Sequence, residues 1–341
     1  MALEEYGWGG RWPSLFADAA ADLDGAVPGR VVRHDGVAVL VATEAGMPSV
    51  PVLASVDPVP VVGDFVVVSR EGAVVAVLPR SGLMRREDPA GGEQPIAANI
   101  DAVLVVCGLD RPVKAGRIQR SVALAWDAGA VPVVVLTKAD LHDDATGVGR
   151  DVAGSTPGVE VLVVSTVGGD GLDEVREIAA GRTILLLGES GAGKSTLANA
   201  LVGEEIAATA DVRAGDAKGR HTTTARQLHP LPGGGVLVDT PGIRAVGLWV
   251  DPDAVASSFA DVETLAESCR FSDCAHDTEP GCAVRAAVEA GDLAPGRLEA
   301  WAALGREAAA AARRADPRAQ HAYERRFGRM VREASKRKRP D

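Results

Sequence analysis

The sequence predicts a multidomain chain: a small N-terminal β-barrel, a central doubly wound α/β domain with a nucleotide site, and a mainly helical C-terminal domain with a metal site. Three observations predict this arrangement. Short Val-rich runs come first, apolar runs alternating with helix-like segments follow, and Cys and His side chains cluster near the C-terminus. We expect the domains to occupy residues 1–85, 95–249 and 250–341.

The composition is that of a globular protein, with 46% apolar and 24% charged residues. We see no signal peptide and no apolar stretch of about 18 residues, so we expect a cytoplasmic protein without a membrane segment. The net charge of −11 is unevenly spread, because from Trp301 onward twelve Arg or Lys outnumber five Asp or Glu. Such a basic tail either meets nucleic acid or is simply solvated.

Residues from about 27 to 83 form short Val-rich runs separated by Gly, Pro and Asp, a pattern typical of a small barrel. An oligonucleotide-binding (OB) barrel is the natural candidate. Its aromatic stacking platform is thin, with only Phe65 among the expected strands. The alternative is a barrel that merely packs against its neighbour.

A Gly-rich and charged stretch over residues 86–95 predicts a linker. After it, apolar runs typical of buried parallel strands alternate with helix-like segments, which predicts a doubly wound α/β domain. The runs cover residues 100–110, 131–136, 159–164 and 183–187, and the helices cover residues 116–130 and 172–179.

The segment GESGAGKST has the spacing of a phosphate-binding loop between a strand and a helix. Its glycines let backbone N–H groups converge on phosphates, Lys194 would reach the β- and γ-phosphates, and the Ser195 hydroxyl would bind Mg²⁺. The predicted contact residues are Gly188, Glu189, Ser190, Gly191, Ala192, Gly193, Lys194, Ser195 and Thr196.

TKAD, at residues 137–140, predicts that the base is guanine. The Asp140 carboxylate would accept two N–H bonds from guanine and be repelled by the acceptor edge of adenine, while the stem of Lys138 packs along the base. The usual motif begins with Asn, so Thr137 loses one amide contact. Ser165, which ends the next strand, either places a backbone N–H at the guanine oxygen or is only a turn residue.

VLVDTPG and GRHTTT predict the parts that sense the γ-phosphate. Asp239 would hold the Mg²⁺ shell, and the Gly242 backbone would contact the γ-phosphate. One of Thr222, Thr223 and Thr224 would close over Mg²⁺, and we favour Thr223. Ile243 occupies the position that usually carries the glutamine orienting the attacking water, so hydrolysis is expected to be slow. His221 either takes that catalytic role or is an exposed switch residue that contacts a partner.

The order of these motifs is more specific than any one of them. TKAD comes first, the phosphate loop second and VLVDTPG last, whereas an ordinary small GTPase begins with the phosphate loop. The same parts in rotated order predict a circularly permuted GTPase. The break also places VLVDTPG next to the C-terminal domain, which predicts that the GTP state passes through residues 243–249 into that domain.

Four metal-binding side chains lie within fourteen residues: Cys269, Cys274, His276 and Cys282. Three thiolates and an imidazole complete a tetrahedral Zn²⁺ site, which leaves no water position and therefore predicts a structural zinc. The remaining cysteine, Cys107, ends a buried strand and is most simply a small core residue.

Taken together, the barrel, IAANIDAVLVVCGLD, the rotated motif order, GRHTTT, DTPGI and FSDCAHDTEPGCAV resemble the ribosome small-subunit-dependent GTPase A family over nearly the whole chain. The resemblance implies a GTPase that binds the small ribosomal subunit late in its assembly, exchanges GTP and GDP, and leaves after hydrolysis. It implies that the barrel and the zinc domain contact ribosomal RNA, and that hydrolysis is weak until the subunit is bound. We expect a monomer with one zinc ion and Mg²⁺ bound together with GTP.

Two alternatives stay open on the sequence. One is an RNA-binding assembly scaffold with a vestigial nucleotide site, favoured by Ile243 and Thr137 and opposed by the intact Lys194, Ser195 and Asp239. The other is an ATP-hydrolysing motor, suggested by the phosphate loop but without a transporter-type signature. GTP turnover with and without small subunits separates the first, and competition between GTP and ATP separates the second.

Overall fold

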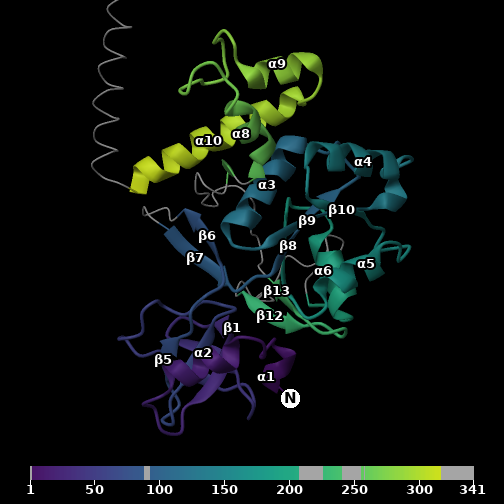
Figure 1. Ribbon diagram of the computed structural model, residues 1–341. Coiled ribbons are helices and arrows are strands. Elements are labelled where there is room, and N and C mark those ends of the chain that lie inside the picture. The colour runs from purple at the N-terminus through teal and green to yellow at the C-terminus, as the bar shows by residue number, and fades with distance from the viewer. Residues whose placement is uncertain (1, 88–92, 207–225, 240–254, 257, 316–341) are drawn as a thin grey trace, which may run out of the picture. The chain divides into compact units, whose positions relative to one another are not determined.

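The computed structural model describes residues 2–87, 93–206, 226–239, 255–256 and 258–315 (Figure 1). The chain divides into two compact units, each considered by itself below. The first unit combines Met1–Arg85 with Pro95–Gly247 and the second combines Arg86–Gln94 with Leu248–Asp341. No described helix is long and apolar enough to cross a membrane.

The α/β part of the first unit is built on a mixed sheet in the spatial order β10-β9-β8-β11-β13-β12. The first five of these strands run parallel, and β12 pairs antiparallel with β13. The strands are β8 Ala102–Gly108, β9 Val131–Thr137, β10 Glu160–Val163, β11 Thr183–Gly188, β12 Gln227–Pro230 and β13 Val236–Asp239. The sequence pattern predicted five of them, while the short, polar β12 has no strand signature of its own.

Helices cover this sheet as the doubly wound prediction requires. Leu104 and Val106 of β8 join one buried cluster with residues of α5 and α6. Val103 and Val105 are equally buried and point to the opposite side, because side chains alternate along a strand. There α3 packs against β8 and β9. The helical segments are α3 Ala115–Asp127, the 3₁₀ turn Ala139–Leu141, α4 Ala145–Ser155, α5 Leu172–Ala179 and α6 Lys194–Val202.

The chain order and the spatial order of the strands differ in an informative way. The central strand β11, which leads into the phosphate loop, comes fourth among the six strands of this sheet and lies between β8 and β13. The chain reaches it from the edge strand β10 through α5. The neighbours of β11 are thus those of a phosphate-loop sheet, although the chain enters that sheet at β8. The rotated motif order is therefore reflected in the fold.

Five N-terminal strands close into a small barrel, as predicted. β1 pairs with β2 and β4, β2 with β3, and β4 with β5, and a bridge between Val52 and Val74 joins the ends. Valines from all five strands fill its core. The strands are β1 Val27–His34, β2 Ala38–Ala42, β3 Ser49–Pro51, β4 Phe65–Val68 and β5 Val74–Val77. The assignment to the OB class stays a prediction.

Two short helices, α1 Ala2–Glu5 and α2 Trp12–Ala19, precede the barrel, and the all-β pattern did not predict them. Side chains of α2, together with Trp8 between the two helices, cover Phe65, whose ring centroid lies 4.1 Å from that of Trp12 and 5.7 Å from that of Trp8. Phe65 is only 1% exposed. It is therefore a core residue of the barrel and has no free face on which a base could stack.

The barrel is joined to the α/β sheet through β1. Arg33 of β1 pairs with Gln227 of β12, so the two sheets are continuous. Next to this pair the fully buried Arg30 donates hydrogen bonds to Tyr6 O (2.6 Å), Gly63 O (3.2 Å) and Thr183 Oγ1 (2.8 Å). Burial lowers the pKa of Arg30 to about 10, opposed by the nearby carboxylates of Asp101 and Asp64. Arg30 thus connects the barrel to the first residue of β11.

The two ends of the stretch predicted to be a linker instead belong to a pair of strands. β6 Leu83–Glu87 pairs with β7 Glu93–Ala98, and residues 88–92 lie outside the described part of the chain. The Arg86 guanidinium donates to the Gln94 side chain across the pair at 2.5 Å. Gly and charge content suggested a linker, but cross-strand pairing is a property of two segments that a single stretch does not show.

The described part of the second unit is mainly helical, as predicted, with α8 Ala260–Ala266, α9 Ala283–Ala290 and α10 Pro295–Ala315. Its buried side chains include Phe259, Val262, Val284 and Leu304. The guanidinium of Arg297, 6% exposed, lies 4.5 Å from the Phe259 ring centroid and donates to both Asp261 oxygens at 2.5 and 2.6 Å. This contact ties α10 to α8.

Candidate functional site: a nucleotide cradle and a metal centre

The phosphate loop links β11 to α6, as the sequence predicted. Gly191 and Gly193 have φ angles of +77° and +89°, in the left-handed region that strongly favours glycine. A Cβ on Gly188 would lie 2.2 Å from the Val106 carbonyl oxygen, so that position excludes any side chain. Ser195 is half-buried in the first turn of α6, and the next residue, Thr196, is exposed.

Lys194, the first residue of α6, folds its side chain back over the loop. Its ammonium donates to the carbonyl oxygens of Gly188 at 2.8 Å and Glu189 at 2.6 Å. The ammonium is therefore held beside the N–H groups of the loop and the start of α6, where phosphate oxygens are attracted. This placement fits the predicted role of Lys194.

The TKAD turn is fastened to the phosphate loop by its first two residues. The Thr137 hydroxyl donates to Ala192 O at 2.6 Å, and Thr137 is only 1% exposed. The Lys138 ammonium donates to Gly191 O at 2.7 Å, and its backbone has a φ of +60°. Thus the expected base-reading turn and the expected phosphate cradle form one connected site.

Asp140 and Ser165 also contact each other, which the sequence did not predict. The Ser165 hydroxyl donates to Asp140 Oδ1 at 2.6 Å, while the Ser165 backbone N–H donates to Asp170 O at 2.9 Å. Ser165 is 2% exposed. In the structure Ser165 therefore orients the Asp140 carboxylate through its hydroxyl, and its N–H is engaged within its own loop.

A set of charged side chains around the cradle escaped the sequence analysis. Asp110, just after β8, accepts hydrogen bonds from Arg111 at 3.1 Å and from Lys138 at 2.9 Å. The hydrogen bond from Arg111, and after it that from Lys138, holds the pKa of the Asp110 carboxyl below its ordinary value. Arg117 of α3 pairs with Glu189 of the phosphate loop. The available signal was position, because Asp110 follows a strand at the same carboxyl edge as the loop.

The predicted Mg²⁺ ligands are only partly described. Asp239 ends β13, which pairs parallel with β11, so its carboxylate lies at the sheet edge that carries the phosphate loop. A carboxylate and the Ser195 hydroxyl are oxygen ligands of the kind Mg²⁺ prefers. His221, Thr222, Thr223, Thr224, Gly242 and Ile243 lie outside the described residues, and their roles stay predictions.

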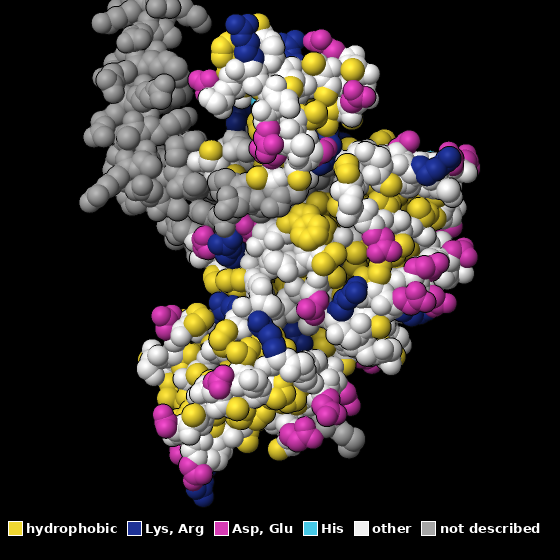
Figure 2. All heavy atoms as spheres, viewed as in Figure 1, with side chains coloured by type: hydrophobic (Ala, Val, Ile, Leu, Met, Phe, Trp, Pro, Cys, Tyr) yellow, Lys and Arg dark blue, Asp and Glu magenta, His cyan; other side chains and the backbone are white. Residues whose placement is uncertain are grey.

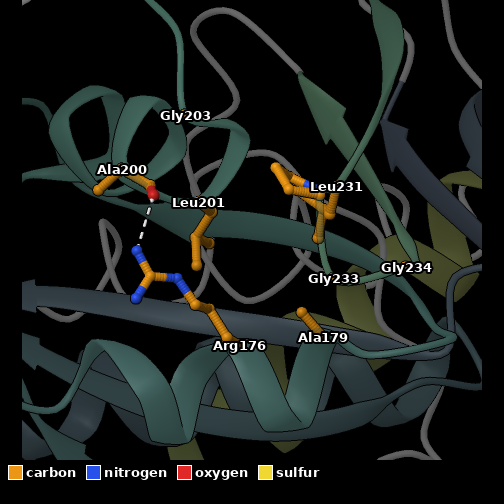
Figure 3. Close-up of a pocket in the computed structure, with 9 residues that line it drawn as sticks. Arg176, Ala179, Ala200, Leu201, Gly203, Leu231, Gly233 and Gly234 are labelled. Carbon is orange, nitrogen blue, oxygen red and sulfur yellow. Dashed lines mark hydrogen bonds between the residues drawn. The ribbon is translucent and has the colours of Figure 1, made fainter.

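Figure 3 shows a separate pocket of about 170 Å³ at the other end of α6. It is lined by Arg176 and Ala179 of α5, by Ala200 and Leu201 of α6, and by the turn between β12 and β13. Arg176 donates to the Ala200 carbonyl at 3.3 Å (Figure 3). Because α6 runs away from the phosphate loop at about 1.5 Å per residue, this pocket is distinct from the nucleotide cradle.

The four predicted zinc ligands do come together in the second unit. One ligand atom from each of Cys269, Cys274, His276 and Cys282 lies within 4.8 Å of all the others. The two sulfurs of Cys269 and Cys282 are 3.9 Å apart, and the His276 Nδ1 lies 3.6 and 3.3 Å from them. Tetrahedral zinc, with bonds of about 2.3 Å to sulfur and about 2.0 Å to nitrogen, requires about 3.8 and about 3.5 Å. The cluster therefore fits one zinc ion held through Nδ1.

Backbone N–H groups near α9 support the sulfur ligands. Cys282 is the N-cap residue of α9, and its sulfur accepts from Arg285 N at 3.4 Å. Cys269 Sγ accepts from Ala283 N at 3.3 Å. The helix N-terminus stabilises negative charge on these thiolates. By contrast, burial raises the pKa of Cys107 to about 11, which agrees with its expected role as a core residue.

Comparison with known proteins agrees with this site. The sequence profile of the RsgA GTPase family matches residues 77–249. The chain is 47% identical over 317 residues to the small ribosomal subunit biogenesis GTPase RsgA of Streptomyces avermitilis, covering 89% of this chain and 85% of that protein. It is 46% identical over 331 residues to the protein of the same description from Streptomyces coelicolor, covering 94% and 90%.

Two solved structures share the fold. The crystal structure of YjeQ from Thermotoga maritima superposes with a TM-score of 0.63 at 26% identity, over 83% of this chain and 98% of that one. YloQ, described as a circularly permuted GTPase, superposes with a TM-score of 0.59 at 23% identity, over 84% and 96%. This likeness of fold, together with the strand order above, confirms the rotated arrangement predicted from the motifs. The chain belongs to the RsgA GTPase family.

Proposed function

We propose that this chain is a GTPase that assists late maturation of the small ribosomal subunit, binds the subunit with GTP and leaves after hydrolysis. The observation that carries the proposal is the joining of the TKAD turn to the phosphate loop through Thr137 and Lys138. It places the carboxylate expected to read guanine and the cradle expected to bind phosphates in one site. The names of the relatives at 46% and 47% identity support the choice of the small subunit as partner.

Nucleotide choice in this proposal rests on Asp140. Its carboxylate is oriented by the Ser165 hydroxyl, which leaves the other carboxylate oxygen and further lone pairs for guanine N–H groups. Adenine presents an acceptor where guanine presents a donor, so an ionised carboxylate there repels ATP. Lys194, Ser195 and Asp239 would bind the phosphates and Mg²⁺. The GRHTTT and DTPG segments would sense the γ-phosphate.

Ribosomal RNA would be met by the barrel and by the metal-binding domain with its basic tail. Figure 2 shows acidic side chains gathered on the surface around α4 and α5, a face that would repel a phosphate backbone. The RNA-facing surface is therefore expected away from these two helices. The proposal also makes the protein a cytoplasmic monomer, since it acts one copy at a time on an assembling subunit.

The deciding experiment is GTP turnover by the full-length protein with and without purified small subunits. We expect slow turnover alone and clear acceleration by the subunits. Lys194→Ala should reduce the accelerated rate by about 10²-fold or more, because it removes a cation that stabilises the transferring phosphoryl group. Arg150→Ala, which removes a positive charge from an exposed position on α4, should behave like wild type.

Three outcomes would contradict the proposal. Wild-type turnover by Lys194→Ala would show that the nucleotide site is elsewhere. ATP competing as well as GTP would show that Asp140 does not select guanine. Tight binding to small subunits without any accelerated turnover would favour the RNA-binding scaffold instead.

A further inference from the structure

Glu279 occupies an unusual place in the metal loop. It lies in the five-residue spacer between the ligands His276 and Cys282. Its carboxylate accepts three hydrogen bonds from main-chain N–H groups: Ala275 N to Oε1 at 3.1 Å, and Asp277 N and Thr278 N to Oε2 at 3.0 and 3.1 Å. Two of these donors flank His276 directly. Both oxygens of one side chain are thus engaged by the turn that carries the histidine.

The turn needs such support because His276 has a φ of +58°. A non-glycine residue in the left-handed region is strained and persists only where the surroundings hold it there. A left-handed residue also turns neighbouring N–H groups toward one side, where they attract an anion. The Glu279 carboxylate supplies that anion from within the chain.

The support of the other ligands comes from elsewhere. N–H groups at and near the start of α9 donate to the sulfurs of Cys269 and Cys282. On the far side of the spacer, Arg285 donates to the Asp277 carbonyl at 2.9 Å. Glu279 therefore supplies the side-chain acceptor for the N–H groups on both sides of His276. The Trp301 ring, with its centroid 5.2 Å from that of His276, packs against the imidazole itself.

We propose that Glu279 is a positioning residue of the metal site, which organises the Ala275–Thr278 turn and so presents the His276 Nδ1 to the metal. The proposal separates two halves of the centre. The start of α9 holds two of the thiolates, and Glu279 holds the imidazole. Loss of Glu279 should therefore weaken one ligand, not dissolve the cluster. The role of Glu279 is confined to the metal loop and does not depend on the GTPase activity.

The test uses full-length protein and two substitutions. Glu279→Ala removes all three acceptor contacts, and Glu279→Gln keeps one acceptor oxygen but turns an N–H₂ group toward a backbone donor. Competition with a chromophoric chelator measures Zn²⁺ affinity. We expect about 10-fold to 100-fold weaker binding for Glu279→Ala, with Glu279→Gln between it and wild type. Glu267→Gln, an equal charge change at an exposed position two residues before Cys269, should match wild type.

A second readout identifies which ligand is affected. With Co²⁺ in place of Zn²⁺, the ligand-field bands of Glu279→Ala should move toward those of His276→Ala, because imidazole is partly replaced by water. When Glu279→Ala and His276→Ala are combined, the loss of Zn²⁺ affinity should not exceed that of His276→Ala alone, since Glu279 acts through His276.

Two results would overturn the proposal. One is Zn²⁺ affinity and Co²⁺ bands of Glu279→Ala equal to those of wild type. The other is a loss that adds fully to that of His276→Ala, which would mean a general structural role. If Glu279→Ala fails to fold with metal, Glu279→Gln decides by the same two criteria.

Discussion

Thr137 stands where the usual motif has Asn, and its hydroxyl makes a hydrogen bond to the phosphate loop. The sequence marked it as a departure, because the usual motif begins with Asn. In the structure its hydroxyl bonds to Ala192 O in a site that is almost fully buried. The adjoining Gly193 has no room for a side chain without pressing on Thr137, since a Cβ there would lie 3.0 Å from the hydroxyl oxygen. Thr137 therefore holds the two loops together, whatever base contact it gives up.

Thr137→Val tests this role, because valine has nearly the same shape and lacks the hydroxyl. The Ala192 carbonyl loses its buried partner, which costs about 1–3 kcal/mol. We expect affinity for GDP and GTP to fall about 10-fold, measured with a fluorescent nucleotide. Thr156→Val is the matched control, because the buried Thr156 hydroxyl, at the C-cap of α4, donates to Val152 O, away from the nucleotide site. Equal nucleotide affinities of the two variants would refute the assignment.

The nucleotide site and the metal site each lie at the N-terminus of a helix. α6 begins at Lys194 and α9 at the residue after Cys282, so each motif places its anion or thiolate at the positive end of a helix dipole. The helices themselves are fixed by different means. α6 is held by its apolar face in the main core, whereas α8 and α10 are joined by the ion pair between Asp261 and Arg297.

The Asp261 pair predicts a pH dependence. Burial by itself raises the pKa of Asp261, but the hydrogen bonds from Arg297 outweigh it and the pKa lies below its ordinary value. The stabilisation is therefore present above the ordinary pKa of aspartate and is lost as the pH falls through the lowered value. Asp261→Asn should melt about 5 °C lower than wild type near neutral pH. That gap should narrow as the pH falls below the ordinary pKa of aspartate.

Calorimetry of the zinc-loaded protein at several pH values measures this difference. Glu289→Gln is the control, because Glu289 forms only a largely exposed pair with Arg285 in α9. It should shift the melting temperature little at any pH. A gap for Asp261→Asn that stayed constant down to the acid limit would exclude the ion pair as its cause.

In the first unit, the α/β sheet and the strands of the barrel form one continuous sheet. Because the motif order is rotated, α5 connects β10 to β11, the strand that leads into the phosphate loop. The barrel strands precede β8, the first strand of the α/β part. The barrel then reaches the far edge of the sheet, where β1 pairs with β12. Arg30 reinforces this joint at the first residue of β11, the strand whose other end is the phosphate loop. The barrel is thereby connected to the α/β sheet both at β12 and at the start of β11.

Arg30→Met tests whether this joint makes the first unit cooperative. Methionine fills a similar volume but leaves Tyr6 O without its Arg30 donor and removes one of the two side-chain donors to Gly63 O, so we expect about 2–4 kcal/mol lower stability in urea unfolding. The barrel and the α/β part should then unfold in separate steps. Arg33→Met lies on the same strand, and Arg33 bonds only to Asp35 nearby; it should cause a much smaller change. Equal losses would argue against a special role for Arg30.

Much of this architecture could be predicted because it depends on local pattern. Continuous apolar runs predicted the buried strands, and ligand spacing predicted the zinc cluster, since both patterns lie within short stretches of sequence. The pattern failed where structure depends on a partner. β12 is too polar to read as a strand alone, and residues 86–95 read as a linker although their ends pair in β6 and β7. Asp110 and Arg117 belong to no recognisable motif. Their place at the site follows from their contacts with Lys138 and Glu189, which the fold brings close.

By itself the sequence determined the order of barrel, α/β and mainly helical segments along the chain, the rotated order of the nucleotide motifs, and the grouping of four Cys and His side chains that fits a metal ion. Each of these is encoded by residue type and spacing. Only the tertiary structure decided that Thr137 and Lys138 fasten the TKAD turn to the phosphate loop, that Phe65 is covered, and that Glu279 supports the His276 turn. The physical reason is that these contacts are hydrogen bonds and packing between side chains and backbone groups, whose approach is set by the folded path of the chain.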